Sequence, residues 1–132
     1  MRLTLRADGA ADLELVWRRY SQPELWSTWA PQIRRVECST DRLEVGSTGT
    51  VFGVVPNLGA RFEVVELVEE QHRWAWDVVA GPVRMHLDHR SESRLGGGTS
   101  TTLVADGPAA AVLTYAPIAR LSLESLVRPP KG

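Results

Sequence analysis

The chain has 132 residues, 43% of them hydrophobic and 23% charged, which is ordinary for a single globular domain that buries its own core. Its formal net charge is −1, and without a concentrated basic face no nucleic-acid partner is expected. No run approaches the roughly 18 consecutive apolar residues of a membrane-spanning helix. We therefore expect one domain over residues 1–128, followed by a disordered tail at 129–132.

The first residues alternate in polarity, unlike the apolar stretch of a signal peptide, and Cys38 is the only cysteine. A lone thiol excludes an internal disulfide and any metal site built on two thiolates, and it fits a reducing cytoplasm. Its alternation with Val36 predicts a small, buried side chain. Lys131 is the only lysine among 15 basic residues, an arginine bias that points to a high-GC bacterial source.

The N-terminal quarter is expected to hold one strand and two short helices. Residues 2–6 alternate with period two, as in an edge strand. Asp8 or Asp12 can cap the first helix, and Pro23 suits the first turn of the second helix, which Pro31 ends. The apolar residues that recur at helical spacing are Leu13, Val16, Trp17, Tyr20, Leu25, Trp26 and Trp29.

From residue 33 to residue 106 the chain is expected to be strand and turn without a helical interruption. Strands are predicted at 33–39, 50–55, 61–69, 72–79, from 83 onward and around 101–105, with turns marked by Gly46 and Gly49 and at 56–59, 81–82 and 96–98. Both parities of 61–69 carry apolar side chains, which a β-bulge near Val64–Val65 would reconcile. Elsewhere apolar and polar residues alternate, which predicts an antiparallel meander with one dry and one wet face.

The chain is predicted to end in a helix over residues 109–128, about 30 Å long and able to cross the whole sheet. Pro117 would lose a hydrogen bond and clash with the carbonyl of Leu113, so a kink or restart is expected there. The apolar residues of this helix occupy more than one stripe. We therefore expect it to contact both the sheet and something else, either the contents of a cavity or a second subunit.

Neither a metal nor a cofactor is expected. In a strand His86 and Asp88 point away from His89, so the three side chains cannot converge on one ion. The glycines at 96–98 join two strands and lack the lysine and helix of a phosphate loop. The polar residues that alternate along the same strand predict a solvated outer face with cross-strand ion pairs; they are Arg84, His86, Asp88, Arg90 and Glu92.

Several short segments, weak one by one, occur in an order and spacing that resembles a known group of proteins. They are Val16-Trp17, Trp29-Ala30-Pro31-Gln32-Ile33 leading into Val36, Val45-Gly46, Arg73-Trp74-Ala75-Trp76, Gly97-Gly98-Thr99 and Leu123-Glu124-Ser125-Leu126. Over nearly its whole length the chain resembles the helix-grip (SRPBCC) superfamily, which includes START domains, the birch-pollen allergen fold and bacterial polyketide cyclase/dehydrase-like proteins.

The resemblance implies an α+β helix-grip fold of order β-α-α-β6-α, in which a curved antiparallel sheet of about seven strands wraps a long C-terminal helix. It also implies an elongated hydrophobic cavity that takes lipids, hormones or polyketides. The superfamily has no universal catalytic motif, so no catalytic residue is carried over from it. Fold alone does not give function, and the residues must be weighed by themselves.

An excess of large apolar side chains marks the expected interior. Five tryptophans in 132 residues are more than a small core readily tiles, so they either pack the core or line a pocket for a planar or aliphatic ligand. The candidate ligand-binding residues are Trp26, Trp29, Phe52, Phe62, Trp74, Trp76, Met85, Leu87, Leu103, Leu113 and Leu121.

Two polar side chains are the candidate catalytic residues. His89 continues the apolar parity of its strand, so burial would lower its pKa and give a neutral base or hydrogen-bond donor. Tyr115 lies near Pro117 and can offer a hydroxyl to the same cavity. The plainer interpretation is that His89 is a core histidine, or is exposed by a slipped register, and that Tyr115 packs the helix. As a pair they would serve enolisation or dehydration.

Three functions therefore stay open. The first is a binder or carrier of an apolar small molecule, favoured by the inward aromatic residues. The second is a polyketide cyclase/dehydrase-type enzyme that uses the His89–Tyr115 pair. The third is a protein-interaction module with a reduced cavity, in which the apolar terminal helix mediates a homodimer.

Overall fold

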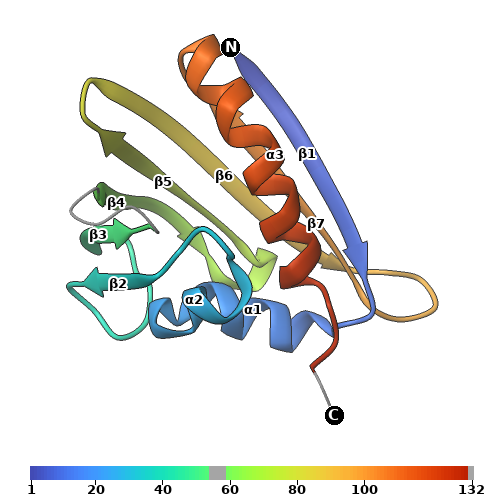
Figure 1. Ribbon diagram of the computed structural model, residues 1–132. Coiled ribbons are helices and arrows are strands. Elements are labelled where there is room, and N and C mark those ends of the chain that lie inside the picture. Colours follow the sequence, from blue (N-terminus) through green and yellow to red (C-terminus); the bar gives the residue numbers. More distant parts are fainter. Residues whose placement is uncertain (54–58, 131–132) are drawn as a thin grey trace.

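The structure is a computed structural model that describes residues 1–53 and 59–130. It contains one antiparallel sheet of seven strands in the order β1-β7-β6-β5-β4-β3-β2 (Figure 1). The strands are β1 (Arg2–Gly9), β2 (Arg35–Cys38), β3 (Thr48–Phe52), β4 (Gly59–Val68), β5 (Arg73–Ala80), β6 (Val83–Ser93) and β7 (Thr99–Asp106). The helices are α1 (Leu13–Ser21), α2 (Trp26–Trp29) and α3 (Ala109–Leu126), with single 3₁₀ turns at Pro23–Leu25 and Glu69–Gln71. This order confirms the expected α+β helix-grip fold.

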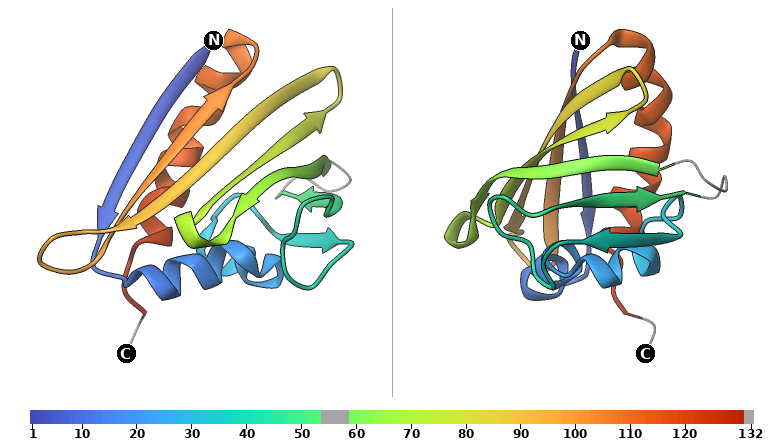
Figure 2. Two further views of the ribbon diagram at one scale, coloured as in Figure 1. Left: turned by 180° about the vertical axis from the view of Figure 1, so that it is seen from behind. Right: turned by 90° about the vertical axis from the view of Figure 1, so that its left-hand side faces the viewer.

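The sheet curves around α3, and the short helices α1 and α2 close one end of the sheet (Figure 2). α3 runs along β1 and β7, its nearest strands, whereas α1 and α2 cross the end of the sheet where α3 finishes (Figure 1). The C-terminal end of α3 is tied down there, because Ala11 N–H donates to Val127 O at 3.0 Å and Arg19 Nη1 donates to Leu126 O at 2.6 Å. One end of the interior is thus closed by helices and the other is not.

Alternating side chains explain the strands, and most expected strands are confirmed to within a few residues. The bulge predicted in β4 is also confirmed, since the pairing with β5 shifts between Val64 and Glu66. Gly49 was expected to mark a turn, but it lies inside β3, where a Cβ would collide with the carbonyl oxygen of Glu37. The turn expected at 56–59 and the end of the strand expected at 50–55 fall largely outside the described residues, as does part of the tail at 129–132.

The terminal helix is continuous and one-sided. A kink or a restart was expected at Pro117; α3 runs from Ala109 to Leu126 through that residue, so the helix does not restart there. Leu113, whose carbonyl loses its hydrogen-bond donor to the proline, is 55% exposed and so lies on the solvent side of the helix. Among the described residues no helix is long and apolar enough to span a membrane. The buried residues of α3 are Val112, Ala119, Ser122, Leu123 and Leu126.

Candidate functional site

Two spaces lie between the sheet and the helices in the part of the chain that the structure describes. A small cavity of about 40 Å³ lies among the aromatic residues near α1 and α2. A groove of about 480 Å³ lies farther along the same strands, between β3–β6 and α3. Four residues line both spaces and mark where they adjoin, and we call these four the partition: Gln32, Ile33, Trp76 and Tyr115.

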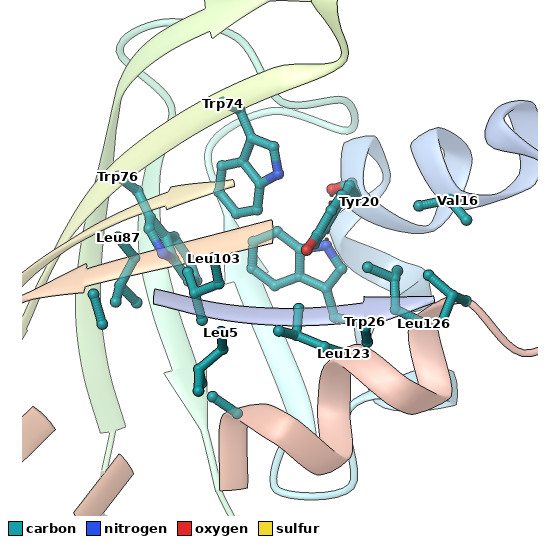
Figure 3. Packing of buried hydrophobic residues seen from close by; sticks show 14 of the residues in the cluster. Leu5, Val16, Tyr20, Trp26, Trp74, Trp76, Leu87, Leu103, Leu123 and Leu126 are labelled. Atoms are coloured by element: carbon teal, nitrogen blue, oxygen red, sulfur yellow. Dashed lines mark hydrogen bonds between the residues drawn. The ribbon is translucent and has the colours of Figure 1, made fainter. Parts of the chain in front are cut away.

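The end near α1 and α2 is filled by interlocking rings (Figure 3). Trp26 lies with its ring centroid 5.9 Å from that of Trp74 and 5.1 Å from that of Trp76, and Phe62 packs 4.9 Å from Trp76. The remaining cavity of about 40 Å³ suits water, which needs about 10–15 Å³, rather than an organic ligand. We call this region the packed end.

Two indole N–H groups at the packed end lack acceptors. Trp26 Nε1 donates to Tyr20 O at 2.9 Å, but Trp74 Nε1 and Trp76 Nε1 are buried with no hydrogen-bond partner among the described residues. An unpaired buried donor costs roughly 1–3 kcal/mol. The bulk of these rings, rather than their polar atoms, therefore stabilises the packed end.

The groove is apolar, and its size falls in the range of about 300–1,000 Å³ that is typical of small-molecule pockets. None of its described lining residues carries a charged side chain. Apart from the partition, the lining consists of Val51, Gly53, Gly59, Ala60, Val78, Ala80, Met85 and Leu87. The groove can therefore shield an apolar ligand from water without leaving a charge beside it.

His89 lies in the packed end and is held neutral. Its ring stacks on Trp74 at a centroid distance of 4.0 Å, and Nδ1 lies 3.3 Å from the carbonyl oxygen of Trp74. A carbonyl only accepts, so Nδ1 carries the proton and Nε2 is the basic nitrogen. Burial lowers the pKa of His89 to about 4, a shift that the hydrogen bond to Trp74 opposes only in part.

Tyr115 is the candidate catalytic residue that reaches the groove. It is half-buried on α3 and belongs to the partition, and burial raises the pKa of its hydroxyl to about 12. Among the described residues its hydroxyl makes no hydrogen bond. His89 lines the small cavity but is not among the described residues that line the groove. The two candidate catalytic side chains therefore face a common space only in the small cavity.

The predicted ligand-binding residues divide between several places. Met85, Leu87 and Trp76 line the groove. The small cavity is lined by Trp26, Trp29, Trp74, Trp76 and Leu103, and Phe62 packs into the same core. Phe52 lies on the other parity of β3, with the guanidinium of Arg35 at 3.9 Å from its ring centroid, and it is absent from the described lining of either space.

Two of the expected ligand-binding leucines face solvent. Leu113 is 55% exposed and Leu121 is 58% exposed, so the expectation that they line the cavity is corrected. The reason is geometric, because α3 buries a single face against β1 and β7. The second apolar stripe of the helix is turned away from the interior, toward water.

Sequence reasoning missed several residues of the groove, chiefly Gln32, Ile33, Val51 and Ala60. Val51 pairs directly with Ala60 across β3 and β4, and Phe62, on the same face of β4 as Ala60, is opposite Val78. Following parity across neighbouring strands would have selected Val51 over Phe52. The aromatic residue was preferred for its size, which gives no information on the direction in which it points.

The outer face of the sheet is ionic, as predicted. His86 Nδ1 lies 2.7 Å from Asp77 Oδ1, and Arg73 contacts Asp88 at 2.8 Å and Glu66 at 2.7 Å. No group of three potential metal ligands occurs within residues 1–53 and 59–130. Cys38 is half-buried rather than buried, because β2 is one of the two edge strands of the sheet.

Comparison with known proteins agrees with this architecture. A family model described as "Polyketide cyclase / dehydrase and lipid transport" matches residues 2–128. Solved structures that superpose over 96% of this chain and 94% of theirs include a protein from Nitrosospira multiformis (TM-score 0.80, 15% identity), a protein from Chromobacterium violaceum (0.72, 16%) and Ara h 8.0201 (0.77, 10%). At such identities the likeness shows the fold alone. No curated protein matches the sequence.

Proposed function

The chain belongs to the family described as polyketide cyclase / dehydrase and lipid transport, and from this premise we propose that it binds an apolar small molecule in the groove. The observation that carries the proposal is a space of about 480 Å³ between β3–β6 and α3 whose described lining has no charged side chain. Removing a methylene group from water contributes about 0.8 kcal/mol. Ten buried methylenes would therefore offset the several kcal/mol that association costs in lost freedom.

The placement of His89 supports binding over catalysis. A general base must come within hydrogen-bond reach of the proton it removes. His89 borders the small cavity of about 40 Å³, which is too small for an organic substrate, and the partition lies between that cavity and the groove. Only Tyr115 of the candidate acid/base pair borders the space where a ligand would lie. The cyclase/dehydrase alternative would therefore lack its base.

Two adjacent valines of β5 provide a matched test of the site. Val78 lines the groove, whereas Val79 belongs to the opposite face of the sheet beside Arg61 and Arg84. We expect the wild-type protein to bind the apolar dye Nile red with increased, blue-shifted fluorescence. Val78→Trp should weaken binding at least tenfold by filling the groove, and Val79→Trp should leave the affinity unchanged.

Circular dichroism and thermal melting of both variants establish that each one folds. Failure of the wild-type protein to bind Nile red would contradict the proposal. Equal binding by the wild-type protein and a folded Val78→Trp variant would contradict the assignment of the groove as the site.

A homodimer through α3 is a second candidate, because the exposed apolar residues Leu113, Ile118 and Leu121 lie on that helix. Clusters of exposed apolar side chains often mark interaction surfaces. Light scattering tests this directly: a dimer that becomes monomeric in Leu113→Ser/Leu121→Ser supports it, and a strictly monomeric wild-type protein rules it out.

A further inference from the structure

From the polarity of the groove we infer which chemical class of ligand it selects, an inference that rests on the proposed function. We propose that the ligand is uncharged and carries a hydrogen-bond acceptor, such as a ketone or ester carbonyl, at the end that meets the partition. An apolar body would extend from there along β4, β5 and β6. A fatty-acid anion should bind far more weakly than its neutral ester, because the described lining offers no cation to pair with it.

The exclusion of charge follows from the alternation of the strands. Five charged residues directly adjoin groove residues in sequence, and none of them lines the groove. Arg61, Asp77 and Arg84 belong to the opposite face of the sheet. Asp88 pairs with Arg73 on that outer face, and Arg34, which follows Ile33, is exposed to solvent. The groove's described lining offers no cation, and residues 54–58 have no charged side chain in their sequence. A buried carboxylate without a cationic partner loses its hydration uncompensated, so an anionic ligand would bind far more weakly than its neutral ester.

The polar end of the ligand is fixed by two side chains of the partition. Among the described lining residues, the polar side-chain atoms belong to Gln32 and Tyr115, apart from the buried indole nitrogen of Trp76. Ser122 Oγ donates to Gln32 Oε1 at 2.6 Å, which leaves the amide nitrogen of Gln32 as a donor. Gln32 and Tyr115 thus each bring a donor group to the lining of the groove, and two donors match a carbonyl oxygen.

The protonation of Tyr115 agrees with this role. Burial raises the pKa of the Tyr115 hydroxyl to about 12, so the group remains a donor at neutral pH. His89 is on the other side of the partition and neutral, so it supplies no positive charge that would attract an anion. The charged residues in the C-terminal half of α3, Arg120 and Glu124, are exposed to solvent.

Three probes with twelve-carbon chains separate the effect of charge from that of a hydrogen-bond acceptor. Methyl laurate has a neutral acceptor, laurate has a charge, and dodecane has neither. Each would compete with bound Nile red at neutral pH, below its own aggregation limit. We expect laurate to bind at least tenfold more weakly than methyl laurate. Tyr115→Phe should weaken methyl laurate about five- to tenfold, the effect of one lost hydrogen bond, and leave dodecane unchanged.

Gln32→Met, which keeps the length of the side chain but removes the amide, should have the same selective effect as Tyr115→Phe. Laurate bound as tightly as methyl laurate would overturn the inference. So would equal effects of the two substitutions on methyl laurate and dodecane. In either case binding of Nile red and dodecane in the groove would leave the proposed function standing, whereas failure of every probe to bind would overturn both.

Discussion

The two ends of the interior are lined by the same strands but filled very differently. β5 presents Trp74 and Trp76 where α1 and α2 close the sheet, and Val78 and Ala80 farther along. β6 runs beside it in register, so Met85 is opposite Val78. The volume of inward side chains falls along β5 and β6, and α3 packs on β1 and β7 rather than on these strands. Where the inward residues are small and the helix does not approach them, a hollow remains. Where the inward residues are tryptophans, their rings fill the space and form a packed core.

Stability should therefore depend on the packed end. Trp26 is 1% exposed and contacts Phe62, Trp74 and Trp76. Trp26→Ala should lower the free energy of unfolding by about 3–5 kcal/mol, because it removes a large buried ring and leaves a cavity. Urea denaturation measures this loss. A cost below about 1 kcal/mol would show that the packed end is not the stabilising core.

Acid should destabilise the packed end through His89, whose pKa in the folded protein is about 4 against 6.5 for the free side chain. Below about pH 6.5 the unfolded chain binds a proton at His89 that the folded protein does not bind. The free energy of unfolding is therefore highest above about pH 6.5 and falls as the pH drops toward about 4. Between about pH 7 and pH 5 this loss amounts to about 2 kcal/mol.

His89→Gln provides the control for that titration, because the other ionisable groups stay the same. Its free energy of unfolding should fall less over this pH interval than that of the wild-type protein, by about the same 2 kcal/mol. Parallel pH profiles of the two proteins would show that His89 titrates normally and is not desolvated in the packed end.

Truncation in the groove should cost little. Met85 is half-buried and faces the existing hollow, so Met85→Ala should lower the free energy of unfolding by less than about 1 kcal/mol. Leu103→Ala, at a residue of the packed end that is 2% exposed, should cost about 2–5 kcal/mol and is the matched comparison. Equal costs at the two positions would erase the distinction between the ends.

Much of the fold follows from the sequence, because strand alternation and helical spacing are local. The bulge at Val64–Glu66 was predictable, since apolar residues on both parities of one strand need an extra residue to face one core. The continuity of α3 through Pro117 was not. Pro117 and Leu113 both lie on the exposed side of α3, and only the docked helix determines which side that is.

The site was harder to predict than the fold. The sequence predicted Trp76, Met85 and Tyr115 as interior residues from their place in the strand alternation or on the terminal helix, and all three line the groove. Leu113 was misplaced because a helix with two apolar stripes does not reveal which stripe packs on the sheet. The division of the interior into a filled and an empty part depends on the spacing between sheet and helix. That spacing is a tertiary property that no local pattern encodes.

The most direct measurement is a carbon–proton correlation NMR titration of the methyl groups with methyl laurate. The account predicts shifts concentrated at Val51, Val78, Met85 and Leu87, which line the groove, with Val16 and Leu126 of the packed end unchanged. Shifts confined to the packed end, or none at saturating methyl laurate, would contradict it.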